Sequence, residues 1–257
     1  MTAVVAPVAQ RDRSQSPKRI LAVTRLLFVN KMAILYTPLI VLGAIFLLNL
    51  AIWYLIVFAI DVNTPGNNTA HLGYSGAVSY IYVYFIVVAV QVIARTFPFS
   101  LGFGVTRRDF YLGASLAFVI LSVFFAAVLT IMSAIEVATN GWGVEGRMFA
   151  PLYFTDPNWA LRFVMYLVVF LFCLFIGSTA ASVFVRWRAT GLVVFFILLA
   201  VILLGLIALA TFTNSWGAVG NWFAVRTPFA ITLWTLVPTV VAGVAGFFIL
   251  RRATPKN

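Results

Sequence analysis

The sequence predicts an all-α polytopic membrane protein with six transmembrane helices. The chain has 257 residues, of which 63% are hydrophobic and only 9% charged, whereas soluble domains average about 45–50% apolar and about 25% charged residues. The apolar residues form long uninterrupted runs, which favour helices over the alternating strands of a membrane barrel. A net charge of +11 would suggest nucleic acid in a soluble protein. In a membrane protein it reflects Lys and Arg on the cytoplasmic side, so no nucleic-acid partner is expected.

Six apolar segments are long enough to cross a bilayer, which requires about 20 helical residues. Together they predict a single transmembrane domain over residues 34–250. The expected spans cover residues 34–60, 76–94, 110–137, 160–185, 189–212 and 229–250. Pro238 has no backbone N–H and is expected to kink the last span.

Positive charge orients these spans. Lys and Arg concentrate before span 1, between spans 2 and 3, between spans 4 and 5, and after span 6, while the opposite side holds only Arg147, Arg162 and Arg226. By the positive-inside rule both termini face the cytoplasm. The expected location is the plasma membrane, which in bacteria is the cytoplasmic membrane.

The ends of the chain are polar and basic. Residues 1–17 predict a disordered cytoplasmic tail and residues 251–257 a short second one. No signal peptide is expected, because the first 33 residues lack a continuous apolar core. Residues 18–33 predict a basic amphipathic helix in the cytoplasmic interface, or alternatively an inward extension of span 1. The cations of this interface helix are Lys18, Arg19, Arg25 and Lys31.

The outer loops differ in composition. Residues 61–75 contain proline, glycine and several asparagines and predict an irregular loop. Residues 138–159 and 213–227 carry aromatic side chains, which are typical of the outer aromatic belt. Re-entrant half-helices are the alternative for residues 138–159.

Catalytic chemistry is nearly absent. The chain has one histidine, His71, in a predicted loop, one cysteine, Cys173, in an apolar run, and six carboxylates. No His, Cys, Asp or Glu group has metal-ligand spacing, and no GxxxxGK[ST] phosphate loop occurs. We therefore expect neither an enzyme nor a metal or cofactor bound by this chain. The only acid within a span, Glu136, lies at the outer end of span 3, so energy for uphill transport must come from another protein, or the chain is a passive pore.

A few mildly polar side chains within the spans are candidates for a substrate path, namely Asn49, Gln91, Ser178 and Thr179. Asn49 is the strongest of them, because an unsatisfied amide near the middle of a span is costly. A substrate path lined by such mildly polar side chains would suit an amphiphilic substrate. The alternative is that these groups form interhelical hydrogen bonds worth about 0.6 kcal/mol each.

The loop between spans 2 and 3 contains FPFSLGFGVTRRDF, residues 97–110. Pro98 in a first turn, with Thr96 as the cap and Gly102 as the stop, predicts a short helix. Thr106 and Asp109 predict a capping box at the start of span 3.

The short helix would display aromatic side chains and is followed by two arginines. Its apolar residues are Phe97, Phe99, Leu101 and Phe103, which suit either a protein partner or the headgroup region of the membrane. Arg107 and Arg108 oppose the macrodipole of the helix that they begin. They therefore call for lipid phosphates or a protein contact.

These features resemble the permease subunit of an ABC type-2 transporter. The resemblance rests on the basic amphipathic N-terminal helix, on six spans with both ends inside, and on a short helix followed by G-x-[ST]-R-R-x-[FY]. The motif is Gly104-Val-Thr-Arg-Arg-Asp-Phe110, with Gly113 after it. The architectural likeness extends over most of the chain from Lys18 onward.

The resemblance implies that the loop between spans 2 and 3 forms a coupling helix that docks on a separate ATPase. It also implies two ATPase subunits that bind ATP and Mg²⁺, a second permease copy or paralogue, and compact re-entrant helices within residues 213–227. The coupling residues would be Phe97, Pro98, Phe99, Leu101, Gly102, Phe103, Gly104, Arg107 and Arg108.

The sequence thus predicts the membrane-spanning subunit of an ATP-driven exporter of an amphiphilic small molecule, peptide or lipid, working by alternating access. Two other classes stay open. One is a passive channel or a carrier that does not use ATP. The other is a membrane adaptor or immunity protein.

Overall fold

A computed structural model describes residues 16–59, 76–150 and 158–253, which form helices and turns without a strand. Most of the expected N-terminal tail, the loop that contains His71, residues 151–157 and residues 254–257 lie outside the described residues. Within the described ranges, five helical stretches are long and apolar enough to cross a membrane. The chain is therefore an all-helical protein with the character of an integral membrane protein.

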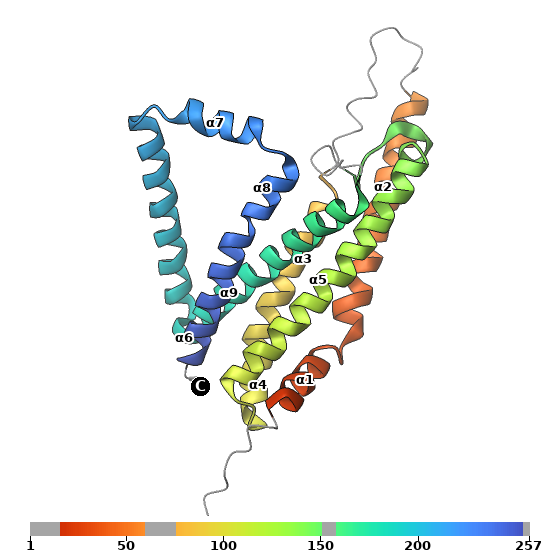
Figure 1. Cartoon of the computed structure of the whole chain (residues 1–257). Coiled ribbons are helices and arrows are strands. Elements are labelled where there is room, and N and C mark those ends of the chain that lie inside the picture. The colour runs from red at the N-terminus through yellow and green to blue at the C-terminus, as the bar shows by residue number, and fades with distance from the viewer. Residues whose placement is uncertain (1–15, 60–75, 151–157, 254–257) are drawn as a thin grey trace, which may run out of the picture.

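The helices follow one another with short connections (Figure 1). Three of the elements are single π-helical turns, in which the backbone is wider than in an α-helix. In chain order the elements are α1 (Ser16–Leu27), η2 (Met32–Tyr36), α2 (Thr37–Ala59), α3 (Ser79–Gln91), η4 (Val92–Thr96), α4 (Phe97–Gly102), α5 (Arg107–Ala138), η5 (Gly141–Glu145), α6 (Trp159–Phe212), α7 (Trp216–Val225), α8 (Pro228–Trp234) and α9 (Leu236–Arg251).

The N-terminal helix is separate from the first long helix. α1 ends at Leu27, a turn follows, and η2 begins at Met32. Residues 18–33 are therefore not one continuous helix, and Lys31 lies at the start of the following helix.

Two prolines explain two of the π turns. η2 immediately precedes the turn that contains Pro38, and η4 immediately precedes the turn that contains Pro98. A proline cannot donate to the carbonyl four residues earlier and its ring crowds that carbonyl. The wider π turn allows the helix to continue through the proline. The prediction that Thr96 caps a separate helix is wrong, because Thr96 is helical and makes no capping bond. α3, η4 and α4 form one run from Ser79 to Gly102.

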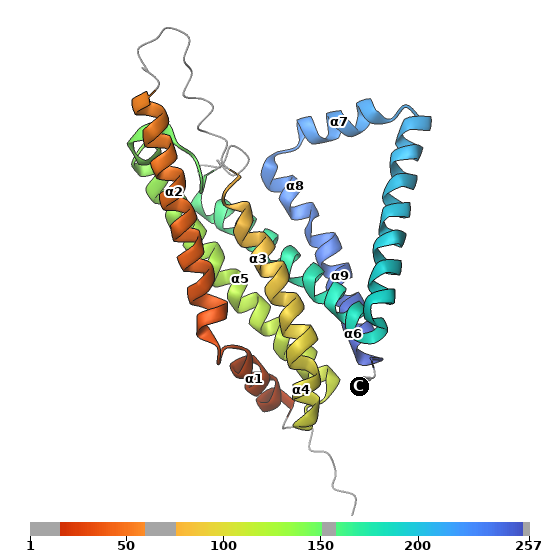
Figure 2. The same ribbon diagram turned by 180° about the vertical axis from the view of Figure 1, so that it is seen from behind.

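α6 turns back on itself at Arg188, whose φ of 59° and ψ of −156° are not helical. A straight α-helix of its 54 residues would measure about 81 Å, far more than a bilayer core of about 30 Å. The break lies between the fourth and fifth expected spans. After it, the 189–212 part of α6 runs apart from α9, and α7 followed by α8 connects the two (Figures 1 and 2).

Pro238 interrupts the last apolar stretch. The carbonyl of Trp234 would normally accept from the N–H of residue 238, which proline lacks. α8 ends at Trp234 and α9 begins at Leu236.

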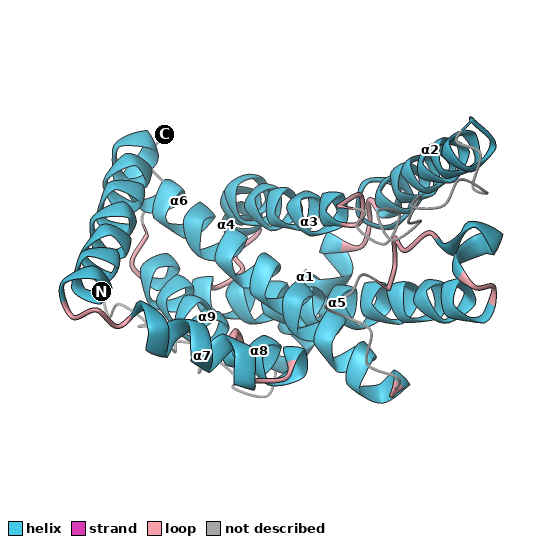
Figure 3. Cartoon of the chain, turned by 90° about the horizontal axis from the view of Figure 1, so that it is seen from above, coloured by secondary structure: helices cyan, strands magenta, loops and turns pink. Residues whose placement is uncertain are grey.

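A cluster of buried aromatic rings joins α3, α5 and the first part of α6. Phe85, Phe125 and Phe170 are fully or almost fully buried, and their ring centroids lie 4.5 to 6.1 Å apart. Seen from above, α2 and α7 lie at opposite sides of the molecule with this packed core between them (Figure 3). The core therefore holds the first part of the chain together, whereas the 189–212 arm is exposed along its length.

The two ends of the molecule differ in charge. α1, α4 and the last turn of α9 lie at one end, which we call the α4 end (Figures 1 and 2). The described cations of the α4 end are Lys18, Arg19, Arg25, Lys31, Arg95, Arg107, Arg108, Arg186, Arg188, Arg251 and Arg252. The opposite end carries Arg147, Arg162 and Arg226.

Candidate functional site

α4 presents two aromatic residues to the outside and anchors a third inside. Phe97 is fully buried and packs edge-on against Phe110, with ring centroids 5.3 Å apart. Phe99 and Phe103 are 56% and 73% exposed and form an edge-to-face pair at 4.7 Å. Of the expected coupling residues, Phe97 therefore fixes the helix, while Phe99 and Phe103 form its free apolar surface. Pro98 is exposed beside Phe99, and Leu101 is half-buried.

α4 ends in a left-handed turn at Gly104. The N–H of Val105 donates to the carbonyl of Ser100, and the N–H of Gly104 donates to that of Leu101. Together with a φ of +74° at Gly104, these two bonds make a Schellman motif, in which a left-handed residue closes the helix. α4 thus has Gly102 as its last residue, as predicted, and the left-handed residue that closes it is Gly104, two residues later.

Substituting Gly104 by Ala should destabilise this turn by about 1 kcal/mol, since a Cβ disfavours the left-handed conformation. Gly102→Ala is the matched control, because Gly102 is helical and a Cβ there would meet no atom within 4 Å. We expect thermal unfolding in detergent to show a loss for Gly104→Ala and no loss for Gly102→Ala. Equal melting temperatures for the two variants would contradict the assignment of the stop.

Thr106 begins α5. It has an extended backbone, and its hydroxyl oxygen accepts the N–H of Asp109 at 3.1 Å. Asp109 is only 6% exposed, and its negative charge lies at the positive end of the helix dipole. This local arrangement fixes where the loop ends and α5 starts.

The two arginines after Thr106 have different surroundings. Arg107 donates from Nη1 to the carbonyl oxygen of Arg251 at 3.2 Å, at the C-terminal end of α9. That end carries the partial negative charge of the α9 dipole, so Arg107 has a favourable partner within its own chain. Arg108 is exposed.

α1 lies across the beginning of α5 at very short range. The Thr24 hydroxyl donates to the carbonyl oxygens of Ile20 and of Gly113, each at 3.0 Å. A Cβ at Gly113 would lie 2.7 Å from Val23 Cβ and 2.9 Å from the Ile20 carbonyl oxygen. Gly113 is therefore required for this crossing. Val23 and Leu27 are buried by it, whereas the charged side chains Lys18, Arg25 and, in part, Arg19 remain accessible.

The four substrate-path candidates occupy separate environments. Asn49 is half-buried on α2 and donates to the carbonyl of Ile45 at 3.2 Å, within its own helix. Gln91 is exposed and lines a pocket between α3 and the segment that follows α1.

Ser178 and Thr179 lie in a buried contact between α6 and α9. Thr179 Oγ1 donates to the carbonyl of Ala242 at 2.7 Å, and Tyr111 Oη donates to that of Gly243 at 2.7 Å. A Cβ at Gly246 would approach Tyr111 Oη to 2.8 Å. Thr179 is 6% exposed and Ser178 fully buried. Side-chain hydrogen bonds to backbone carbonyls hold these helices together here.

A buried carboxylate organises the opposite end of the molecule. Glu136, 1% exposed, accepts the N–H groups of Met148, Phe149 and Ala150 at 2.8 to 2.9 Å and the indole N–H of Trp142 at 3.3 Å. The loop it holds bends sharply: Trp142 has a φ of 60°, and its carbonyl accepts from Tyr54 Oη.

The neighbouring buried cation belongs to the start of α6. Arg162 is 7% exposed and donates to Ser133 Oγ at 2.8 Å, one turn before Glu136 on α5. Tyr166, one turn further along α6, donates to the carbonyl of Phe149. The sequence indicates only that Glu136 lies at the outer end of the third span, and it does not reveal this cluster. The sequence does contain one signal for this cluster. The acid Glu136 lies near the end of one apolar run, and the cation Arg162 lies near the start of the next.

Across the described parts of the chain, no three His, Cys, Asp or Glu side chains gather closely enough to hold an ion. Comparisons with models of protein families, with curated proteins and with solved structures find no match to this chain.

Proposed function

We propose that this chain is the membrane-spanning permease subunit of an ATP-driven ABC transporter. The observation that carries the proposal is the exposed aromatic pair of Phe99, on α4, and Phe103, directly after α4, with Phe97 buried beneath them. Exposed aromatic residues on a rigid, basic end of a helical bundle are typical anchors of protein interfaces. The partner would be an ATPase, because the sequence has no phosphate loop of its own.

The proposal includes a topology. The two arms of α6 count as two spans, which gives six, and the α4 end faces the cytoplasm, as its cations favour. The described ends of the chain then both lie inside, in a plasma membrane that is the cytoplasmic membrane in a bacterium. α7 would lie at the outer surface between the last two spans.

Function requires partners beyond this chain. Two ATPase subunits would bind ATP and Mg²⁺, and a second permease copy or a paralogue would complete the transporter. Alternating access would then export an amphiphilic small molecule, peptide or lipid.

The test removes the apolar surface of α4. The double variant Phe99→Asp and Phe103→Asp should abolish co-purification with an ATPase and ATP-dependent transport in vesicles, because two carboxylates replace the exposed aromatic pair that would pack against the ATPase. Val29→Asp is the control, since Val29 is a 75% exposed apolar residue at the same end and outside α4. It should leave ATPase binding unchanged.

Other outcomes assign other functions. Solute flux through the purified chain alone, independent of ATP, would identify a channel or passive carrier. An unaltered ATPase complex in the double variant would refute the docking role of α4. A complex that moves no solute but protects cells from a membrane toxin would identify an adaptor or immunity protein.

A further inference from the structure

We propose that the pocket between α3 and the α1–η2 connection binds the headgroup of an anionic phospholipid from the adjacent leaflet. The pocket has a volume of about 280 Å³, below the usual range of about 300–1,000 Å³ for drug-sized ligands. It can hold a phosphate with its glycerol, while the acyl chains remain outside. The inference requires only that the chain lies in a membrane, and it is independent of the proposed ATPase.

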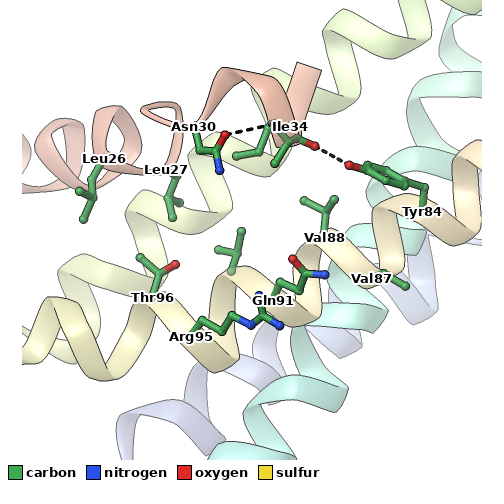
Figure 4. A pocket seen from close by; sticks show the side chains of 12 residues that line it. Leu26, Leu27, Asn30, Ile34, Tyr84, Val87, Val88, Gln91, Arg95 and Thr96 are labelled. Carbon is green, nitrogen blue, oxygen red and sulfur yellow. Dashed lines mark hydrogen bonds between the residues drawn. The ribbon is translucent and has the colours of Figure 1, made fainter. Parts of the chain in front are cut away.

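The pocket is lined by both polar and apolar side chains. Figure 4 shows Asn30 on the α1–η2 connection facing Gln91, Arg95 and Thr96 on the α3–η4 helix, with aliphatic side chains on both segments. Val87, Gln91 and Arg95 follow each other at four-residue intervals and so share one face of the α3–η4 helix. A ligand that joins a charged head to an apolar part matches this mixed lining.

The positive charge in the pocket favours an anionic ligand. Arg95 is the only ionised side chain among the residues that line the pocket. It is exposed, and its side chain makes no hydrogen bond or ion pair with the described residues. Arg95 lies 16 residues after the start of α3, or about 24 Å along the helix, a depth near the boundary of the hydrocarbon core. A guanidinium at that depth is well placed to contact lipid phosphate.

The walls of the pocket are preformed. Two of the three π turns line it, since Ala33 and Ile34 belong to η2 and Val92, Arg95 and Thr96 to η4. π turns occur frequently at functional sites. Asn30 Oδ1 accepts the N–H of Ala33 at 3.2 Å, and Tyr84 Oη donates to the carbonyl of Ala33. The first bond is local to the α1–η2 connection, and the second fixes that connection against α3 without the ligand.

The experiment titrates the purified full chain in detergent with dioleoyl-phosphatidylglycerol or dioleoyl-phosphatidylcholine and counts bound lipids by native mass spectrometry. We expect one site that prefers phosphatidylglycerol. Arg95→Gln should weaken that site about tenfold, since one charge-assisted contact is lost. Arg252→Gln, which removes an exposed cation at the same end but outside the pocket, should leave it unchanged.

A second variant tests the pocket by filling it. Ala33→Trp adds bulk without removing a polar side chain and should abolish the same site, which keeps the test decisive if Arg95→Gln does not fold. Unaltered phosphatidylglycerol binding in Ala33→Trp would overturn the proposal. Displacement of the lipid by inorganic phosphate or glycerol 3-phosphate at equal concentration would also overturn it, because the site would then take a soluble anion.

Discussion

Glu136→Gln should lower the stability of the protein by about 3 kcal/mol or more. The carboxylate of Glu136 accepts four hydrogen bonds at 1% exposure, and a bond to a charged group contributes about 1.5–3 kcal/mol. Glutamine keeps the size of the side chain, but its amide N–H₂ would face the N–H groups that the second oxygen accepts. At least one buried backbone N–H is then left without an acceptor.

The loop that Glu136 holds should also loosen in the Glu136→Gln variant. The φ values of 49° at Asn140, 60° at Trp142 and 56° at Glu145 are unfavourable conformations that cost about 1–3 kcal/mol each and persist only under outside constraint. Without the Glu136 charge this constraint weakens, so amide hydrogen exchange in residues 141–150 should accelerate in the variant. Melting in detergent should fall by about 6–12 °C.

Glu145→Gln is the matched control, because Glu145 is an exposed carboxylate in the same loop. Its stability should stay within about 0.5 kcal/mol of the unaltered protein. If Glu136→Gln melted at the temperature of Glu145→Gln, the buried carboxylate would not be the organising group of this loop.

Gly113→Ala should detach α1 from α5. The added methyl group would lie 2.9 Å from the carbonyl oxygen of Ile20, a backbone atom that cannot rotate away, and 2.7 Å from Val23 Cβ. α1 must then move as a unit, which breaks the Thr24 hydrogen bond to the Gly113 carbonyl and exposes Val23 and Leu27. We expect a loss of about 3 kcal/mol in the docking of α1, from one hydrogen bond and part of two apolar side chains.

Hydrogen exchange measures this docking directly. Protection of the amides in residues 18–27 should decrease roughly a hundredfold, since about 1.4 kcal/mol corresponds to a factor of ten. Gly43→Ala is the control: Gly43 is helical, and a Cβ there would meet no atom within 4 Å. Normal protection of α1 in Gly113→Ala would show that the crossing accommodates a methyl group at residue 113, and it would contradict the close approach of the two helices.

Features that depend on neighbouring residues could be predicted from the sequence. Apolar run length indicates the long helices, and Thr106 is recognisable as a cap because its partner Asp109 is three residues away. The break at Arg188 falls between two apolar runs that are each long enough for one span. Pro98 shows the limit of this reasoning, because a proline in a first turn and a proline after a π turn look alike in sequence.

Contacts between distant segments could not be predicted. Arg107 finds its acceptor at Arg251, 144 residues later, and Gly113 meets a helix 89 residues earlier. Glu136 binds amides 12 to 14 residues away, across a loop whose left-handed turns the sequence does not specify. Each of these depends on how helices pack, and a single sequence carries no direct record of that packing.

The continuity of α3, η4 and α4 has a mechanical consequence. From Ser79 to Gly102 the backbone is one helical rod of 24 residues, about 36 Å long, with no loop in which a displacement could be absorbed. A sideways force on Phe99 therefore becomes a torque on the whole of α3. The most compliant point of the rod is the π turn at Val92–Thr96. Bending there would move Arg95, while Phe85 remains fixed in the buried core.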